Sequence, residues 1–528
     1  MELRGRRRIF TDFEEVTKDN VKQILRDSMP THEINREEML YLLHYEKGDQ
    51  PLVREKIIRP EIDVRAISNL ANYITEFKLG YVWASPVSIV QRSDRLPQGS
   101  DSIQDNAGIT QLNDFYYAEE KDSKDQEMAR FVEICGLGYQ MIDIKRDFEE
   151  GDSPFDLITL SPLYTFIVYS SDIRHTPLLG VTYTVDRLGQ KKLFTCVAKD
   201  AVYYITSQYK LNKDGSRKSD RNGNELPPIY SIMGEDGVEA NPIGEVYIGE
   251  CDRSFDLTGC FERQIDDMNA LNILESDLVN DISQTTQSIW LTTDIEFEKD
   301  AEGNEIAPVG GQWVMAKSNP NSNQKPDIKA LTIPYDYSGV ISNISTKKDD
   351  ILERAFVPKQ SEAGNITGVA SSLTSGWAAA EASACKESLV IKKFFQWRNK
   401  IAIKACKNAA QAGVTEVDIL SPSDVDVRFV RQKTFDMATK VNSLSTMINC
   451  LVDPKTAMST VDLFPNLAEA IEDSVDNMKK YQENLLKQNE KNEQEDLFDE
   501  DGNLINQTER TMQDSSDQTE NSPAEQML

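Results

Sequence analysis

Neighbouring carboxylates are the residues of this chain whose types and spacing come closest to those of a catalytic or metal site. Asp266-Asp267 and Asp349-Asp350 are two such pairs, and paired carboxylates can hold a divalent cation or exchange protons with a substrate. Both pairs fall in segments whose apolar residues recur with helical spacing. Adjacent residues of a helix point about 100° apart, so the two carboxylates of a pair do not converge on one ion. A solvated helix face is therefore the favoured interpretation of both pairs.

Other signs of catalytic chemistry are absent from the sequence. It contains no Walker phosphate loop, no Gly-x-Gly-x-x-Gly, no Gly-x-Ser-x-Gly and no His-Glu-x-x-His. The histidines His32, His44 and His175 are isolated, and each is interpreted as a surface or core residue. The seven cysteines show no Cys-x-x-Cys spacing, so reduced and mostly buried thiols are expected, and Cys251 and Cys260 do not indicate a zinc site. We predict no enzyme activity, no metal site and no cofactor.

The charge of the chain limits what it can bind. Its 528 residues carry a formal charge of −30. This charge makes it unfavourable for nucleic acid to wrap around the protein, because a DNA-binding protein normally presents a basic face. Residues 484–528 hold 12 Asp and Glu against 3 Lys and Arg, a net −9, with few apolar residues, so this stretch is predicted to be a disordered acidic tail. No run of 18 apolar residues occurs and none follows the arginines at positions 4 and 6–8. We therefore expect neither a membrane span nor a secretory signal, and a cytoplasmic setting.

Gly364 and Gly368 bracket the polar stretch Asn365-Ile366-Thr367. Glycine adopts backbone angles that other residues avoid, so a loop with two glycines four residues apart can bend at both ends. Taken alone, this pattern is typical of an ordinary turn. Its neighbours make it more informative, because a predicted helix ends at Pro358 and a basic helix begins at about Trp377.

The helix predicted over residues 377–412 is unusually basic for so acidic a chain. Five of its lysines fall within about 60° of one another on a helical wheel. They are Lys386, Lys393, Lys400, Lys404 and Lys407. An apolar stripe adjoins them, made of Val390, Phe394, Trp397 and Ile401. Two explanations of the row of lysines are open. It is either a solvated face beside a packed one or a surface that meets acidic neighbours or DNA.

The elements that must position these residues alternate between helix and strand. Helices are predicted over 12–29, ending at Pro30, and over 36–45, 67–80 and 111–135, with a strand between 81 and 90. Short β-branched and aromatic runs divided by Gly, Pro, Asp and Ser predict an antiparallel β region from Tyr139 to Ile205, followed by a hairpin or exposed loop over 210–224.

The second half of the chain is predicted to be mostly helical. Helices are expected over 261–290 and 340–356, with a compact strand-and-loop insertion at 291–337 between them. Residues 435–486 are predicted to be helical with a break at Asp453-Pro454. The fold class predicted for the whole chain is α+β.

The order of these elements resembles that of portal proteins of tailed double-stranded DNA phages, in particular the Gp6-like family of phages with long tails. The stretches that carry the resemblance are LLHYEKGDQPLVRE (42–55), NLANYITEFKLGYVWASPV (69–87), ICGLGYQMI (134–142), NPIGEV (241–246), FERQIDDMNALNILESDLVNDI (261–282) and FVPKQSEAGNITGVA (356–370). Together they span residues 40–410.

The resemblance implies a portal fold that assembles into a ring of about twelve subunits. It divides the chain into an α/β wing, a helical stem, a small α/β clip and a helical crown. The implied boundaries are the wing at 1–260, β-rich at 139–250; stem helices at 261–290 and 338–358; the clip at 291–337; a tunnel loop at 359–376; a long wing helix at 377–412; the crown at 413–483; and the acidic tail at 484–528.

The resemblance also implies which residues face the DNA channel. Those of the tunnel loop are Lys359, Gln360, Ser361, Gly364, Asn365, Ile366, Thr367 and Gly368. Those of the stem are Glu262, Asp266, Glu275, Lys347 and Lys348. An acidic wall would repel the DNA backbone and keep the polymer sliding, while a few donors touch phosphates weakly. The five lysines of the basic wing helix would neutralise neighbouring acidic subunits.

The implied function is a channel at one capsid vertex for DNA packaging and ejection. Its expected partners are further copies of the chain, the double-stranded DNA that passes through, the terminase large subunit, head-tail adaptor proteins, and the major capsid and scaffolding proteins, with no membrane involved. The expected location is the virion, and the host cytoplasm during assembly. Two alternatives are another phage structural protein, of the tail or baseplate, and a metal-dependent nucleic-acid-processing enzyme, which would need a buried acidic cluster.

Overall fold

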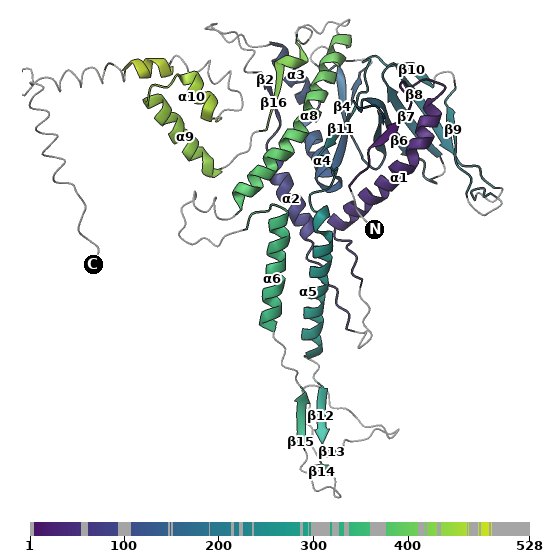
Figure 1. Ribbon diagram of the computed structural model, residues 1–528, viewed down its shortest axis with the longest axis vertical. Coiled ribbons are helices and arrows are strands. Elements are labelled where there is room, and N and C mark those ends of the chain that lie inside the picture. Colours follow the sequence, from purple (N-terminus) through teal and green to yellow (C-terminus); the bar gives the residue numbers. More distant parts are fainter. Residues whose placement is uncertain are drawn as a thin grey trace, which may run out of the picture. The chain divides into compact units, whose positions relative to one another are not determined.

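The chain forms two compact units, residues 1–89 with 107–431 and residues 90–106 with 432–528, each described here by itself. The structure is a computed structural model (Figure 1). It describes residues 5–53, 62–92, 107–145, 148, 152–189, 191–212, 216–220, 225–234, 237–285, 289–293, 295–296, 317–318, 327–331, 337–359, 376–409, 417, 420–429, 434–461, 463, 474, 477–484 and 487. Helices and antiparallel sheets are both prominent, in agreement with the α+β class.

A seven-stranded sheet covers one side of helix α1 (Val21–Glu46). Its strands are β1 (Ile9–Thr11), β5 (Thr165–Ser170), β6 (Pro177–Val185), β7 (Lys191–Ala198), β8 (Ala201–Gln208), β9 (Ile229–Ile232) and β10 (Val238–Ala240). Neighbours are antiparallel except for β1, which runs parallel to β5. The antiparallel region predicted from Tyr139 to Ile205 is thereby confirmed. Apolar side chains such as Ile24 of α1 and Val181 and Phe194 of the sheet are fully buried between the layers.

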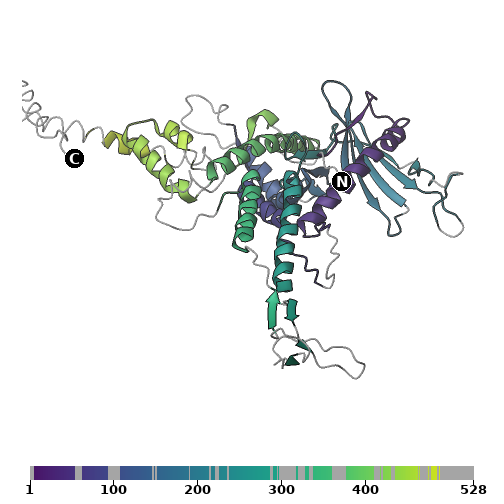
Figure 2. The ribbon, with the colours of Figure 1, turned by 60° about the horizontal axis from the view of Figure 1, so that its bottom comes forward.

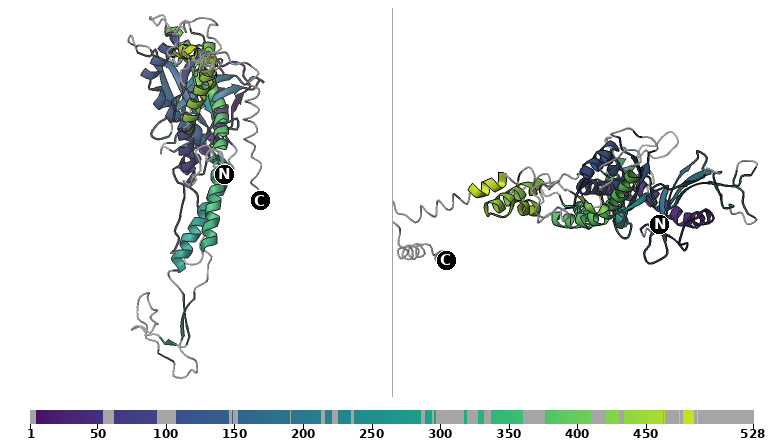
Figure 3. Two further views of the ribbon diagram at one scale, coloured as in Figure 1. Left: turned by 90° about the vertical axis from the view of Figure 1, so that its left-hand side faces the viewer. Right: turned by 90° about the horizontal axis from the view of Figure 1, so that it is seen from above.

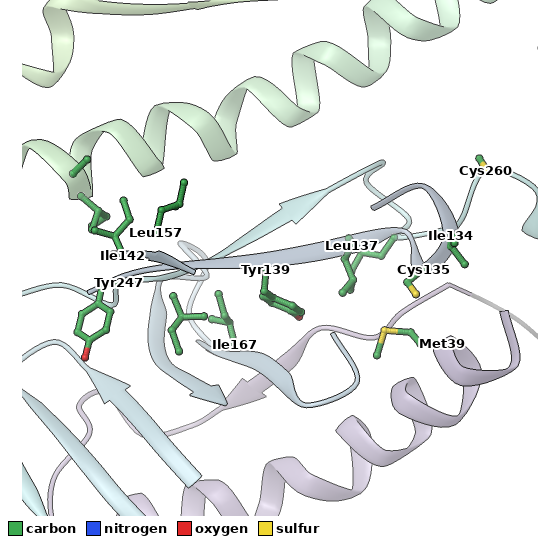
Figure 4. Close-up of a cluster of buried hydrophobic side chains, with 14 of the residues drawn as sticks. Met39, Ile134, Cys135, Leu137, Tyr139, Ile142, Leu157, Ile167, Tyr247 and Cys260 are labelled. Atoms are coloured by element: carbon green, nitrogen blue, oxygen red, sulfur yellow. The ribbon is translucent and has the colours of Figure 1, made fainter. Parts of the chain in front are cut away.

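A second sheet of three strands lies between the larger sheet and two helices. Its order is β11 (Ile248–Asp252), β3 (Leu137–Ile144) and β4 (Phe155–Leu160), and the helices are α4 (Lys121–Cys135) and α8 (Trp377–Ala409). Ile142 and Leu157 point from this sheet toward α8, whereas Tyr139 and Ile167 lie on its other side (Figure 4). The helices approach so closely that a Cβ atom at Gly249 would collide with the Trp397 ring. Glycine is therefore required there for packing. We call the two sheets with α1, α4 and α8 the sheet body.

Two helices, α5 and α6, pack side by side within the first unit (Figures 1 and 2). The 3₁₀ turn η2 (Glu262–Gln264) leads into α5 (Ile265–Thr285), and α6 (Tyr337–Arg354) returns. Between them the chain forms two antiparallel strand pairs, β12 (Ile289–Thr293) with β15 (Asp327–Leu331), and β13 (Ile295–Glu296) with β14 (Lys317–Ser318). We call α5 and α6 the helix pair.

The remaining described elements are shorter. In the first unit they include α2 (Leu70–Val82), α3 (Ala107–Ala118), the 3₁₀ turn η5 (Pro422–Asp424) and β16 (Val425–Arg428). Strand β2 (Ser88–Gln91) lies where the two units adjoin in sequence. The second unit contains α9 (Thr434–Asn449) and α10 (Pro454–Val461), which share a small core of Leu444, Ile448, Ala457, Met458 and Val461. The predicted break at Asp453-Pro454 is confirmed.

Four element predictions were wrong in detail. Residues 12–20, predicted as the start of a helix, precede α1, which begins at Val21. One helix, α1, runs through Pro30, where the sequence predicted a break between two helices. Proline removes one backbone hydrogen bond, but Leu25 before it and Leu42 after it are both fully buried, so packing keeps the helix continuous. The single helix predicted over 111–135 is two, α3 and α4, because Glu120 adopts a left-handed φ of 51°. Trp290, predicted as helical, lies in β12 opposite Ala330.

Candidate functional site

Ion pairs join the two helices of the helix pair. Lys347 Nζ lies 3.3 Å from Asp267 Oδ1, and Arg354 Nη1 lies 2.7 Å from Asp267 Oδ2. About two turns further along α5, Lys348 Nζ lies 2.6 Å from Glu275 Oε1. These side chains are partly exposed, so each pair contributes modestly to stability and is weakened by salt. Their positions along the interface fix the register of α6 against α5.

A second contact of α5 is made by polar side chains spaced four residues apart. Asn272, Ser276 and Asn280 are almost fully buried and face the extended segment 62–68, which we call the strap. The Val64 N–H donates to Asn280 Oδ1 at 2.9 Å, and Asn280 Nδ2 donates to the Val64 carbonyl at 3.0 Å. Ser276 makes the same reciprocal pair of hydrogen bonds with Ala66. These side chains hydrogen-bond to the backbone N–H and carbonyl groups of the strap, as the backbone of a neighbouring β-strand would.

We call these hydrogen bonds between α5 side chains and the strap backbone the ladder. Its geometry follows from two axial distances that are nearly equal. Four residues of α-helix rise about 6 Å, and two residues of extended chain rise about 6.6 Å. Every fourth residue of α5 can therefore bind every second residue of the strap over a short length. The Ser68 N–H continues the series by donating to Asn272 Oδ1 at 3.2 Å, and the Ser68 hydroxyl donates to Glu275. One side of α5 is thus covered by the strap and another by α6.

The segment between α6 and α8 begins and ends at neighbouring points. Val357 is buried, Lys359 Nζ lies 3.1 Å from Asp349 Oδ2, and a Cβ atom at Gly376 would lie 3.7 Å from the Pro358 Cα. Gly376 has a φ of 86°, in the left-handed region that favours glycine. The intervening residues 360–375 lie outside the described part of the chain.

A cleft of about 740 Å³ opens between the N-terminal half of α8, the end of α6 and the loop after β11. Its lining contains six cationic side chains, Arg8, Arg253, Arg263, Arg354, Lys386 and Lys393. It contains three carboxylates, Asp252, Asp256 and Glu387. The cleft is therefore a positively charged surface on a strongly acidic chain.

A buried carboxylate lies behind one wall of this cleft. Glu250 accepts hydrogen bonds from the hydroxyls of Tyr139 at 2.7 Å and Tyr169 at 3.1 Å, and Arg8 Nη1 lies 3.3 Å from it. Burial, followed by the nearby negative charge of Asp252, raises the pKa of Glu250 to about 7. This group therefore changes charge near neutral pH while enclosed in the sheet body.

The described residues contain no group of three or more His, Cys, Asp or Glu side chains that could hold a metal ion. All seven cysteines are free, and five of them are buried, as the sequence predicted. Burial raises the pKa of Cys260 and of Cys135 to about 12, so both thiols are protonated and inert at neutral pH. Among the described helices none is long and apolar enough to cross a membrane.

The comparison with family models decides which family the chain belongs to. A model described as "Phage portal protein, SPP1 Gp6-like" matches residues 31–495 of the 528. The chain belongs to the Gp6-like phage portal proteins. No curated protein matches it significantly. Membership supports a structural role in a phage capsid for the chain, as the sequence resemblance implied.

Within this portal chain, the five predicted channel-facing stem residues occupy three different settings. Asp266 is exposed on α5. Glu275, Lys347 and Lys348 form ion pairs between the two helices, so their charges are largely neutralised. Glu262 differs from all of these. It is 7 % exposed, and its Oε1 lies 2.7 Å from the buried Arg6 Nη2, so the subunit itself encloses it and we remove it from the channel-facing set.

The predicted tunnel loop of the portal chain is described only at its edges. Lys359 is exposed and lies beside Asp349 at the point where the loop leaves α6. Its other predicted contact residues lie outside the described residues: Gln360, Ser361, Gly364, Asn365, Ile366, Thr367 and Gly368.

The five lysines of the long wing helix do not act as one stripe. Lys386 and Lys393 line the cleft. Lys400 and Lys404 both bind Glu245, in the loop before β11, and Lys400 Nζ lies 2.8 Å from it. Lys407 is exposed near the end of the helix. The basic stripe is therefore shared between packing inside the subunit and an open surface.

Sequence reasoning missed the arginines of the portal chain that are buried or line the cleft. Arg6 and Arg398 are fully enclosed, and Arg8 reaches Asp252 at 2.6 Å. One signal was available, because the arginines at positions 6–8 occur in an acidic chain without an apolar segment after them. These arginines pair with carboxylates of their own chain, but the partners are up to 273 residues away, and the sequence does not reveal them.

Proposed function

We propose that this chain is one subunit of a ring-shaped portal channel, at one vertex of a phage capsid, through which double-stranded DNA is packaged and later ejected. The observation that carries the proposal is the family match over residues 31–495. The helix pair, closed at one end by short strands, supports it as a stem of the kind that a channel wall requires.

In this proposal the parts of the chain keep the boundaries predicted from the resemblance, except that the first stem helix ends before β12. Residues 1–260 and the helix 377–412 form the wing, α5 and α6 form the stem, and 291–337 forms the clip. Residues 359–376 form the tunnel loop and 413–483 the crown. The continuous packing of α8 on the three-stranded sheet supports its assignment to the wing.

The contacts of α5 and α6 sharpen the proposal for the channel wall. One side of α5 is covered by the strap and another by α6, which leaves an open surface that includes the exposed Asp266 and Ala270. This surface carries little positive charge, because Lys347 and Lys348 bind carboxylates of α5. A wall that makes few phosphate contacts holds DNA weakly and lets it slide.

The proposed partners follow from the same portal role. About twelve copies would close the ring. The clip would bind the terminase large subunit during packaging and head-tail adaptor proteins afterwards, and the wing would meet major capsid and scaffolding proteins. Assembly would take place in the host cytoplasm and the product would reside in the virion. The family match favours this role over a tail or baseplate protein, and over a nucleic-acid-processing enzyme.

The ring is tested on the purified full-length chain. Native mass spectrometry and electron microscopy are expected to show closed rings of about twelve subunits. A protein that stays monomeric under all assembly conditions, or that forms open filaments only, would overturn the proposed function.

The tunnel loop is tested separately by a DNA packaging assay. Gly364→Pro combined with Gly368→Pro should abolish packaging while leaving rings intact, because proline fixes the backbone at both bends. Replacing the same two glycines by alanine is the matched control, since it adds side chains without fixing φ. Packaging at the wild-type rate with both prolines in place would exclude a moving tunnel loop.

A further inference from the structure

The cleft gathers six cationic side chains on one concave surface, and two of them have no carboxylate partner among the described residues. Four of its six cations bind carboxylates of the subunit. Lys386 and Lys393 are exposed and make no ion pair with any residue that the structure describes. On a chain of charge −30, two open lysines side by side on one helix face are available to an acidic partner.

Large apolar side chains stand beside these lysines. Phe255 is 86 % exposed and Leu389 is 72 % exposed, and both line the cleft. Phe356, which has a left-handed φ of 57°, also lines it and is 47 % exposed. A hollow that combines open aromatic and aliphatic groups with basic residues has the composition of a protein-binding surface.

A complementary surface occurs on α3 and the turn after it. Tyr117 is 88 % exposed, and Asp114, three residues before it on the same side of the helix, is exposed as well. Glu120 is exposed in the following turn. We call Asp114, Tyr117 and Glu120 the acidic ridge. It presents a protruding aromatic side chain between carboxylates, which suits a basic hollow with apolar walls.

The cleft and the acidic ridge face different directions. Helix α3 packs on the buried side of α8, where the Tyr116 hydroxyl donates to Asn399 Oδ1 at 3.0 Å. At about 100° per residue, Asn399 lies about 120–140° around α8 from Lys386 and Lys393. The two surfaces therefore lie on different sides of α8, and one subunit cannot use its own ridge to fill its own cleft.

We propose that the cleft of one subunit receives the acidic ridge of a neighbouring copy of this chain. Two different surfaces on different sides of a subunit form a heterologous contact, and such contacts generate rings when the rotation closes. Lys386 and Lys393 meet Asp114 and Glu120, and Tyr117 enters the hollow beside Phe255 and Leu389. This inference rests on the proposed ring and names the surfaces that would build it.

The test uses charge reversal on full-length chains. A cleft variant carries Lys386→Glu and Lys393→Glu, and a ridge variant carries Asp114→Lys and Glu120→Lys. All four positions are exposed, so the subunits should remain folded, which circular dichroism checks. Each variant should lose ring assembly, with self-association weakened at least about tenfold, because like charges then face each other.

Two further variants make the result specific. Lys191→Glu with Lys199→Glu changes the net charge as the cleft variant does, at exposed sites outside the cleft and outside the basic wing helix, and should form rings normally. A chain that carries both the cleft and the ridge reversals should regain rings, because the swapped charges again attract each other.

The outcomes distinguish this inference from the proposed function. If the wild type forms rings but the cleft variant also forms them, or the doubly reversed chain fails to regain them, the cleft does not receive the ridge although the portal role stands. If the wild type itself never forms rings, the proposed function fails. Native mass spectrometry and sedimentation velocity give both readouts.

Discussion

The sheet body and the helix pair are both held together by opposite charges, but at very different depths. In the sheet body, Arg398 is fully enclosed between Asp125 and the rings of Tyr116 and Phe395. Arg6 is equally enclosed and bridges Glu38 and Glu262. In the helix pair, the cations that reach α5 are about 37–62 % exposed (Figure 3 shows both helices).

The difference in depth changes what these charges do. A buried charge loses its hydration, so removing its partner is costly and the geometry is fixed to one arrangement. A half-exposed pair exchanges its partner for water at little cost. The sheet body is therefore built as a rigid support, whereas the charged contacts of the helix pair can break and re-form without unfolding the subunit.

The largest effect is expected from breaking the Arg398 network. Arg398→Met removes the fully enclosed cation of the buried Asp125 and leaves it only the longer contact with Lys121 Nζ at 3.5 Å, so it should lower the free energy of unfolding by about 3–5 kcal/mol. The measurement is the shift of the urea midpoint. Lys407→Met, the same change at an exposed site of the same helix, should shift it little. Adding Asp125→Asn to Arg398→Met should restore part of the loss, and an effect no larger than that of the control would show that the buried network does not support the sheet body.

The next largest effect concerns pH. The Glu250 pKa rises from 4.5 to about 7 on folding, so the folded state binds a proton that the unfolded state releases between these values. Protonated Glu250 therefore adds stability that is complete below about pH 4.5 and is lost as the pH rises to about 7, on the order of 3 kcal/mol.

This pH dependence is measured as the difference in unfolding free energy between the wild type and Glu250→Gln. The difference should favour the wild type most at low pH and decline up to about pH 7. The comparison with Glu250→Gln is needed because His32 also titrates on folding. Burial lowers the pKa of His32 to about 4, so the stability that neutral His32 contributes is lost as the pH falls, opposite to the effect of Glu250. A difference that is constant from pH 4 to 8 would contradict a titrating Glu250.

A smaller effect is expected where the helix pair holds the strap. Asn280→Ala leaves the Val64 N–H and carbonyl without their partners and should cost about 2 kcal/mol. The loss should be local, so hydrogen exchange of the Val64 amide should accelerate while amides of the sheet body keep their protection. Val279→Ala, at the neighbouring exposed position of α5, should leave that exchange unchanged. Equal acceleration in both variants would mean that the ladder does not fix the strap.

The smallest effect is expected from the ion pairs of the helix pair. Lys348→Ala removes the contact with Glu275 and should lower the unfolding free energy by less than about 1 kcal/mol, with the loss shrinking further in high salt. Arg354→Ala should behave in the same way. A loss as large as that of Arg398→Met would remove the distinction between the two regions.

Local patterns predicted much of the fold because local sequence decides them. The β region from Tyr139 to Ile205 consists of short β-branched and aromatic runs divided by turn residues, and it folds as antiparallel strands. Errors arose where packing overrides a local signal. Pro30 does not end α1, because both halves of the helix are buried against different parts of the core.

The candidate site was less predictable because its members are brought together over long separations. The sequence places Glu262 on the polar face of a predicted stem helix. In the structure it is buried and bonded to Arg6, 256 residues away. Lys393 and Lys400 share one stripe on the helical wheel, yet one lines the cleft and the other binds Glu245.

The sequence by itself determined the family, the order of the elements and the acidic character of the chain, because these depend on motifs, periodicity and composition. Only the tertiary structure decided which charges are enclosed, which are paired between helices and which remain open at the cleft. The physical reason is that the effect of a charge depends on its burial and its partners, and both are fixed by residues far away along the chain.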